Sequence, residues 1–309
     1  MASNKTPVID ILWDMLKAEN KERMVVYFSD VQAAIAQWNI GKTGKSVLSA
    51  DNKANFMKDL VRSDNASANW PKRLANLSIG GRQRVGSGRI LEFIPYVEGQ
   101  TEPFPNRYMP RVGQDATWIQ SVSLPLTSKS LGRKDESWLI QVAVNLKVIE
   151  QHFAVHSPLN VTELTHMQIG VKLAGSEVDS LFRAVIELED GSLVHALVTC
   201  EAKQQGERIL EHQIVEQIVA ANRSVKDIEE FNVHCIIPVA IKAIPPNGEI
   251  YVVEFEAWTP VQASMPEDEL IELKVASEGY YRLVPPVRGV GFQKPKKRKP
   301  RASKKSTSL

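Results

Sequence analysis

Residues 177–217 read EVDSLFRAVIELEDGSLVHALVTCEAKQQGERILEHQIVEQ, and this stretch decides the fold. Apolar residues dominate 177–188 and 193–201, which predicts two strands. The Asp190-Gly191 pair between them is a strong signal for a hairpin turn. Apolar side chains recur at helical spacing over 207–222, so a helix should follow the second strand.

The chain on either side extends this pattern. Apolar runs at 233–241 and 250–258 predict further strands, 138–148 is either a strand or a buried helix, and 161–165 indicates a short capping element. Strands interspersed with a helix are typical of an α/β domain with a mixed sheet flanked by helices. We expect this domain to span residues 111–290.

The first 110 residues are expected to form a separate, helix-rich module. Helical spacing predicts helices at 8–17, 21–38 and 55–62, and Asn69-Trp70-Pro71 is expected to open another. A basic, glycine-punctuated loop at 82–89 precedes a predicted strand at 90–94. This order suits a winged-helix-like or helix-turn-helix module. Residues 100–110 (QTEPFPNRYMP) indicate a linker.

The charge of the chain is divided unevenly. Residues 294–305 (KPKKRKPRASKK) hold eight basic residues and no acidic ones, and without them the net charge of +2 becomes −6. We expect residues 291–309 to be a disordered basic tail, since such a block cannot bury apolar surface. The tail would bind polyphosphates without reading sequence, or it would serve solubility alone.

Features of the whole sequence favour a cytoplasmic protein. No apolar run is long enough to cross a bilayer, and residues 1–7 do not resemble a secretion signal. Cys200 and Cys235 lie in apolar runs, which suits buried thiols in a reducing compartment, with a disulfide between them as the alternative.

Three charged residues of the opening stretch are expected to meet at one edge of the sheet. Glu201 and Lys203 are two apart on a strand, so their side chains face the same side. The hairpin should bring them to Asp179. Two carboxylates can hold Mg²⁺, to which the Ala202 carbonyl would add a ligand, and an ammonium can stabilise charge on a phosphodiester.

Sequence context, rather than the triplet itself, supports this site. An acidic residue, any residue and then lysine occur four times in the chain. Only Glu201-Ala202-Lys203 follows an apolar run, has an aspartate one hairpin upstream and precedes an amphipathic helix. The alternative is a surface hairpin with an ion pair. The apolarity of 193–200 argues against it, because a charge at the end of a buried strand is costly unless paired.

Further polar residues are candidates for the same site. Gln213 and Gln217 are four apart and share a helix face, although helix glutamines are often simply solvated. Glu163 and Glu177 are weaker candidates for an additional carboxylate.

The pattern of Asp179, Glu201-Ala202-Lys203 and the helix glutamines resembles the PD-(D/E)XK nuclease superfamily, in particular type II restriction endonucleases. The resemblance covers about 40 residues, and Val178 stands where the family has a proline. It implies a restriction-endonuclease-like fold, Asp179 and Glu201 as metal ligands and Lys203 as the catalytic lysine. It also implies that Gln213 supports the site from the helix.

The expected function is therefore Mg²⁺-dependent cleavage of double-stranded DNA at a short specific sequence, by a homodimer without an organic cofactor. The N-terminal module more loosely resembles a DNA-reading domain. Its expected DNA contacts are Arg82, Gln83, Arg84 and Arg89, because Arg and Gln form bidentate bonds with guanine and adenine. The alternatives are a repair or recombination nuclease and a non-cleaving DNA-binding protein with a nuclease-like fold.

Overall fold

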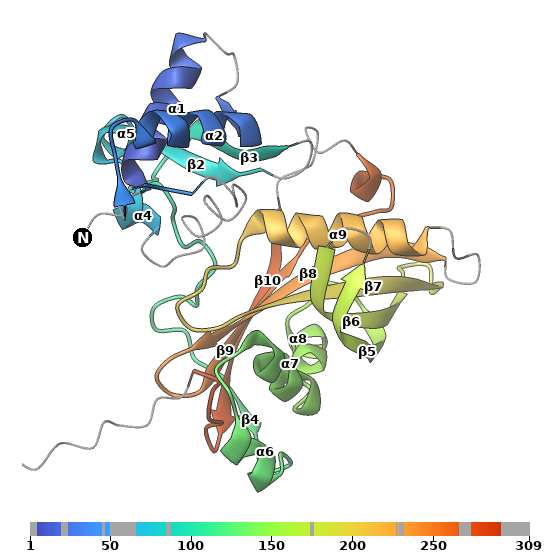
Figure 1. Ribbon diagram of the computed structural model, residues 1–309. Helices are drawn as coiled ribbons and strands as arrows, with labels where there is room; N and C mark the ends of the chain where they lie inside the picture. The colour runs from blue at the N-terminus through green and yellow to red at the C-terminus, as the bar shows by residue number, and fades with distance from the viewer. Residues whose placement is uncertain are drawn as a thin grey trace, which may run out of the picture.

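Two sheets organise the described part of the chain. The computed structural model describes residues 5–19, 24–44, 47–49, 66–84, 88–173, 176–226, 228, 232–265 and 273–291. Within them, a three-stranded sheet lies near the N-terminus, and a seven-stranded mixed sheet is formed from Thr117 onward. Figure 1 shows the smaller sheet with its helices (blue to cyan) beside the larger body (green to red). The predicted α/β class with a mixed sheet is confirmed.

The N-terminal unit packs short helices on an antiparallel sheet of strand order β1-β3-β2. Its core is rich in aromatic rings, and Trp70 meets Phe104 edge to face with ring centroids 5.0 Å apart. The elements are α1 (Thr6–Ala18), β1 (Val25–Tyr27), α2 (Phe28–Asn39), α4 (Ala66–Asn69), α5 (Lys72–Asn76), β2 (Ile79–Gln83) and β3 (Arg89–Pro95).

Some of the predicted N-terminal elements are wrong. A single helix over 21–38 is replaced by β1 and α2, because β-branched Val25 and Val26 favour an extended chain that pairs with β3. The basic loop is shorter than 82–89, since β2 runs through residue 83 and β3 begins at 89. The helix expected at 55–62 lies outside the described residues.

The larger sheet has the strand order β4-β10-β9-β8-β7-β6-β5. Neighbouring strands are antiparallel, except that β7 pairs parallel with β8 and β4 with β10. The elements are β4 (Thr117–Gln120), α6 (Leu126–Leu131), α7 (Glu136–Asn145), α8 (Val148–Val155), β5 (Val161–Leu173), β6 (Ser176–Glu187), β7 (Leu193–Lys203), α9 (Glu211–Val225), β8 (Val233–Ile244), β9 (Glu249–Phe255), the 3-10 turn η2 (Gln262–Ser264) and β10 (Val275–Val284).

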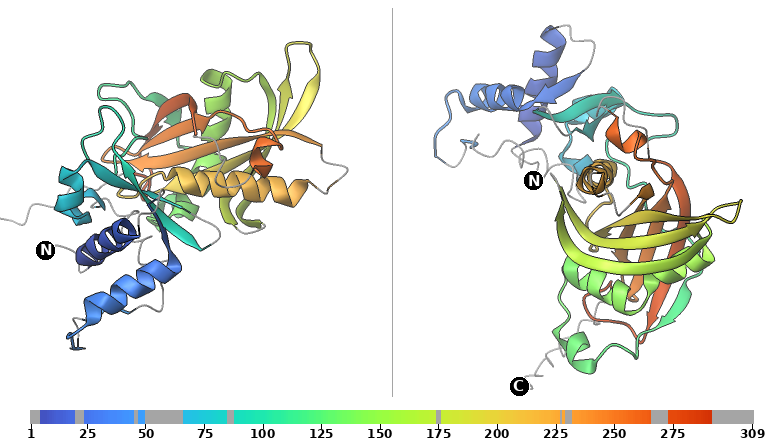
Figure 2. Two further views of the ribbon diagram at one scale, coloured as in Figure 1. Left: turned by 90° about the horizontal axis from the view of Figure 1, so that it is seen from above. Right: turned by 90° about the vertical axis from the view of Figure 1, so that its right-hand side faces the viewer.

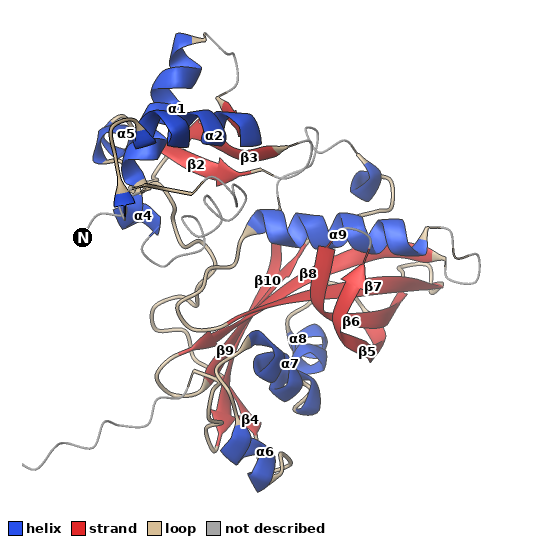
Figure 3. Cartoon of the chain, viewed as in Figure 1, coloured by secondary structure: helices blue, strands red, loops and turns tan. Residues whose placement is uncertain are grey.

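Helices cover both faces of this sheet. Residues of α7 and α8 join one buried cluster with one face, and residues of α9 join a second cluster with the opposite face. Figures 2 and 3 show the strands between α9 on one side and α7 and α8 on the other. Helix α9 links the parallel strands β7 and β8, as a parallel pair requires a crossover connection. The crossover brings the start of α9 to the carboxyl end of β7.

The predicted hairpin is confirmed, with a short loop between β6 and β7. The Leu188 amide donates to Ser192 O and the Gly191 amide to Leu188 O, both at 2.9 Å. Gly191 has φ +79°, a conformation that most side chains disfavour. The predicted strands at 233–241 and 250–258 correspond to β8 and β9.

Three segments around the larger sheet differ from the prediction or decide between its alternatives. The stretch 138–148 holds most of α7, then a turn at 146–147 and the first residue of α8, so the helical alternative is correct. The capping element at 161–165 is instead the start of the 13-residue strand β5. The helix expected over 207–222 begins at Glu211, because residues 204–207 form a turn in which the Gln204 amide donates to Glu207 Oε2 at 2.8 Å.

Both cysteines are buried free thiols, as predicted. In the β7–β8 register, Cys200 lies opposite Val239, four positions from Cys235, which places the two thiols too far apart for a disulfide. None of the described helices is long and apolar enough to cross a membrane. The domain boundary near residue 110 stays a prediction, and residues 292–309 of the expected tail lie outside the described chain.

Candidate metal centre

The candidate site lies where β6 and β7 separate, at the carboxyl end of β7. The last backbone pair between the two strands joins Ser180 to Cys200. One residue further, the Asp179 side chain accepts a hydrogen bond from the Ala202 amide at 2.8 Å. A carboxylate therefore bonds to a β7 amide just where the ladder between the strands ends.

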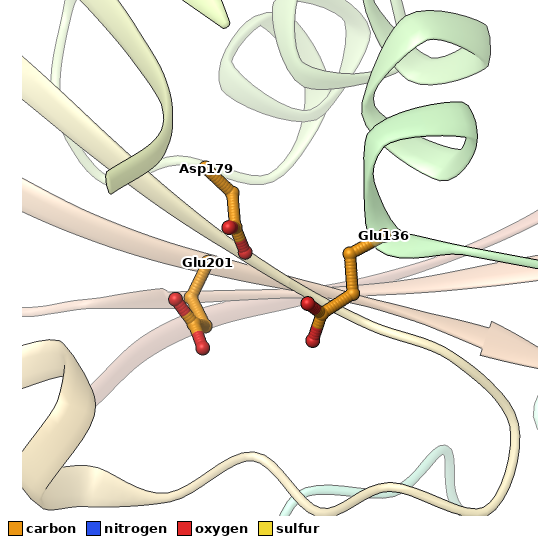
Figure 4. Close-up of side chains that lie close together, drawn as sticks. All are labelled: Glu136, Asp179 and Glu201. Atoms are coloured by element: carbon orange, nitrogen blue, oxygen red, sulfur yellow. The ribbon is translucent and has the colours of Figure 1, made fainter. Parts of the chain in front are cut away.

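Three carboxylates converge at this edge. Glu136, Asp179 and Glu201 each offer an oxygen, and these oxygens all lie within 4.8 Å of one another. Figure 4 shows the three side chains pointing toward a common space. Asp179 comes from β6, Glu201 from β7 and Glu136 from the first turn of α7, so three separate elements build the cluster.

Lys203 is ion-paired with two members of this cluster. Its Nζ lies 2.5 Å from Glu201 Oε1 and 2.8 Å from Glu136 Oε1. These contacts confirm that Glu201 and Lys203 point to the same side of β7. Glu201 is 3% exposed and Lys203 8%, so the pair is buried and the alternative of a surface ion pair is wrong.

Burial and charge shift the ionisation of the site. Burial, reinforced by the charge of Glu201, raises the pKa of Asp179 to about 7. Burial by itself would lower the pKa of Lys203, but the charges of Glu201 and Glu136 raise it to about 12. These shifts keep Lys203 charged near neutral pH and favour the protonated form of Asp179 far more than is usual for an aspartate.

A cavity of about 360 Å³ opens beside the cluster. Its described lining holds six carboxylates and two cations, an imbalance that favours binding of positive charge. The lining residues are Glu136, Ser137, Ser176, Glu177, Asp179, Glu201, Lys203, Glu207, Arg208, Gln213, Glu216 and Gln217.

Both helix glutamines line the cavity, but Gln217 makes the direct contact with the cluster. Its Nε2 donates to Glu201 Oε2 and, at 3.2 Å, to the Glu177 carbonyl. Gln213 Oε1 and Gln217 Oε1 are buried without a hydrogen-bond partner in the described chain. These two oxygens could accept from a molecule in the cavity. The supporting role predicted for Gln213 stays a prediction.

The additional carboxylate expected by the sequence is Glu136, which the pattern did not identify. Asp135-Glu136 ahead of an apolar segment is a helix-start signal, and Asp135 caps α7 by accepting from the Trp138 amide at 2.8 Å. That signal predicts the helix but not its place beside β7. Of the two weaker candidates, Glu177 lines the cavity, whereas Glu163 on β5 lies outside it.

The cluster fits a hard divalent cation. Carboxylate oxygens are the preferred ligands of Mg²⁺ and Ca²⁺, and two oxygens on one ion lie at most about 4.2 Å apart for Mg²⁺ and about 5 Å apart for Ca²⁺. Separations within 4.8 Å fit the limit for Ca²⁺, and binding of Mg²⁺ would draw any wider pair slightly closer. The cluster contains no histidine or cysteine ligand, which makes it unlike a zinc centre.

The four residues expected to contact DNA lie around the β2–β3 hairpin. Arg82 Nη2 and Arg84 Nη2 are ion-paired with Glu92 Oε2 at 3.2 and 2.6 Å, and Arg89 begins β3. Gln83 is 5% exposed, so its amide does not reach the surface. Gln83 is therefore not placed to contact DNA.

In comparisons with known proteins, the chain matches no family model, and no curated protein or solved structure shows significant similarity to it.

Proposed function

We propose that this protein is a Mg²⁺-dependent endodeoxyribonuclease that cleaves double-stranded DNA at a short specific sequence, in the manner of a type II restriction endonuclease. One observation carries the proposal. Asp179, Glu201 and Lys203 meet at the edge of a sheet, beside a cavity and together with a third carboxylate, Glu136.

Asp179, Glu201 and Glu136 would hold the metal ion, with the Ala202 carbonyl as a further candidate ligand. When bound, a divalent cation lowers the pKa of a coordinated water and offsets the negative charge of a phosphodiester. Metal binding requires ionised carboxylates, so Asp179 has to release its proton. The acidic cavity would repel a DNA phosphate unless a cation were present.

Lys203 and Gln217 would assist cleavage in ways other than binding the metal ion. The Lys203 ammonium is charged, largely buried and adjacent to the carboxylates, where a cation stabilises developing negative charge more strongly than it does in water. Gln217 fixes the orientation of Glu201 through its hydrogen bond, as residues behind a metal ligand commonly do.

The N-terminal unit would read the DNA. Its element order of helix, strand, helices and a two-stranded hairpin, on an antiparallel sheet, supports a winged-helix-like module. Arg82, Arg84 and Arg89 around the hairpin would contact DNA, although Glu92 partly neutralises Arg82 and Arg84. The free thiols suit the cytoplasm. We further propose a homodimer, because cutting both strands requires two active sites.

Incubation with a plasmid of known sequence, with Mg²⁺ or with EDTA, tests this function. We expect discrete fragments in Mg²⁺ and none in EDTA. A Mg²⁺-dependent smear would instead indicate a nuclease without a recognition sequence, as in the repair alternative. DNA binding without any cutting would indicate a non-cleaving binding protein and would contradict the proposal.

A further inference from the structure

Arg208 is a second cation in the cavity that the sequence pattern did not single out. It lies in the segment between β7 and α9, five residues after Lys203. Its side chain is 8% exposed and lines the same cavity as Lys203. Burying a guanidinium is costly, so its position needs an explanation.

The Arg208 guanidinium forms a hydrogen bond with the N-terminal unit. Arg208 Nη1 donates to the carbonyl of Phe104, and Phe104 belongs to the aromatic core of that unit. Leu210 packs against the same core. Arg208 and Leu210 thus join the N-terminal unit to the segment that lines the cavity.

The same segment also contacts the cluster of three carboxylates, Glu136, Asp179 and Glu201. Gln204 Nε2 donates at 2.7 Å to the carbonyl of Asp135, the residue before Glu136. Lys203, directly before Gln204, is paired with Glu136 and Glu201. The segment 203–208 therefore contacts both the carboxylate cluster and the core of the N-terminal unit.

The charge balance of the cavity indicates what Arg208 can bind. Lys203 is held between two carboxylates at 2.5 and 2.8 Å, so much of its charge is already compensated. A phosphate entering a cavity lined by six carboxylates needs further positive charge. A guanidinium carries five N–H donors in a planar fork that matches phosphate oxygens, so one group can bond to Phe104 and to a phosphate together.

We propose that Arg208 contacts a backbone phosphate of DNA bound in the cavity, and that the Phe104 carbonyl positions its guanidinium. The N-terminal unit then sets where the phosphate is held relative to the metal cluster. This inference rests on the proposed function, because it takes DNA as the occupant of the cavity.

The test is DNA binding measured over a series of salt concentrations, with Ca²⁺ in place of Mg²⁺ and a fluorescent random-sequence duplex as the probe. Arg208→Gln keeps a donor for the Phe104 carbonyl but removes the charge. We expect it to lower the slope of log affinity against log salt by about 1. Arg208→Lys should retain the slope, since it retains the charge. Leu210→Ala, the control, removes an apolar contact of the same junction without removing charge and should also retain the slope.

A slope for Arg208→Gln equal to that of the wild type, with the thermal unfolding of both proteins matched, would overturn the proposal. Arg208 would then only join the two units. Cleavage is measured separately on the same proteins. A lowered slope without cleavage by the wild type supports the phosphate contact and refutes the nuclease. Cleavage with an unchanged slope refutes the phosphate contact alone.

Discussion

At the scale of single residues, Asp179 is a carboxylate whose ionised form is disfavoured by its surroundings in the site. Its pKa of about 7 exceeds its ordinary value of 3.8 because burial and Glu201 disfavour the charged form. The raised pKa means that the protonated form favours folding. This contribution is fully present below about pH 3.8 and is lost as the pH rises through about 7.

We therefore predict that Asp179→Asn stabilises the metal-free protein. The gain in unfolding free energy should grow between pH 4 and pH 7 and reach the order of a few kcal/mol at pH 8. Thermal unfolding in EDTA at pH 5 and pH 8 measures it. Equal gains at the two pH values, or a loss at pH 8, would mean that Asp179 is not held in this environment.

Gln217 is predicted to matter more for metal binding than Gln213. The Gln217 amide donates to Glu201, whereas the Gln213 side-chain oxygen is buried without a hydrogen-bond partner in the described chain. Gln217→Ala should weaken Mg²⁺ binding by about 10- to 100-fold, as is typical when a partner of a metal ligand is lost. Calorimetric titration of both alanine variants measures the difference, and a larger effect of Gln213→Ala would reverse the assignment.

At the scale of elements, sequence patterns predict the part of the site that lies within one hairpin. Alternation and the Asp190-Gly191 turn predict β6, β7 and the approach of Asp179 to Glu201, because a hairpin fixes its own register. Glu136 is different, since α7 meets β7 through packing of residues far apart in the chain. The apolar pattern predicts too early a start for α9, because Ile209 and Leu210 continue the helical spacing but lie in the segment before the helix.

The β6–β7 turn provides a test at this scale. Gly191→Ala should destabilise the protein by about 1 kcal/mol, because an L-residue disfavours the positive φ. A Cβ at this position meets nothing within 4 Å, so a clash does not contribute. Gly191→Asn should cost less, since asparagine tolerates this conformation. Chemical denaturation measures both, and equal losses would show that backbone conformation is not the cause.

At the scale of the whole molecule, the chain combines an acidic cavity with a basic stretch of sequence. The cavity is acidic, and residues 294–305 carry eight basic residues. A cation bound in the cavity and the basic segment would both attract a polyanion such as DNA. The segment would do so by releasing counterions, and therefore in a salt-dependent manner.

Deletion of residues 294–309 should weaken nonspecific DNA binding and flatten its dependence on salt, while Mg²⁺-dependent cleavage persists. Binding of a random duplex over a series of salt concentrations, beside a plasmid assay, measures both effects. An unchanged salt dependence would exclude a DNA-binding role for the segment.

The most direct test of the central claim compares DNA cleavage in Mg²⁺ by the wild type, Lys203→Ala and Glu163→Gln. Glu163 is a carboxylate of the same sheet outside the cavity, so its variant is the control. We predict that Lys203→Ala cleaves at least about 10²- to 10³-fold more slowly than the wild type yet keeps its DNA affinity in Ca²⁺. Glu163→Gln should cleave at the wild-type rate. Cleavage by Lys203→Ala at the wild-type rate would contradict the assignment of this cluster as the active site.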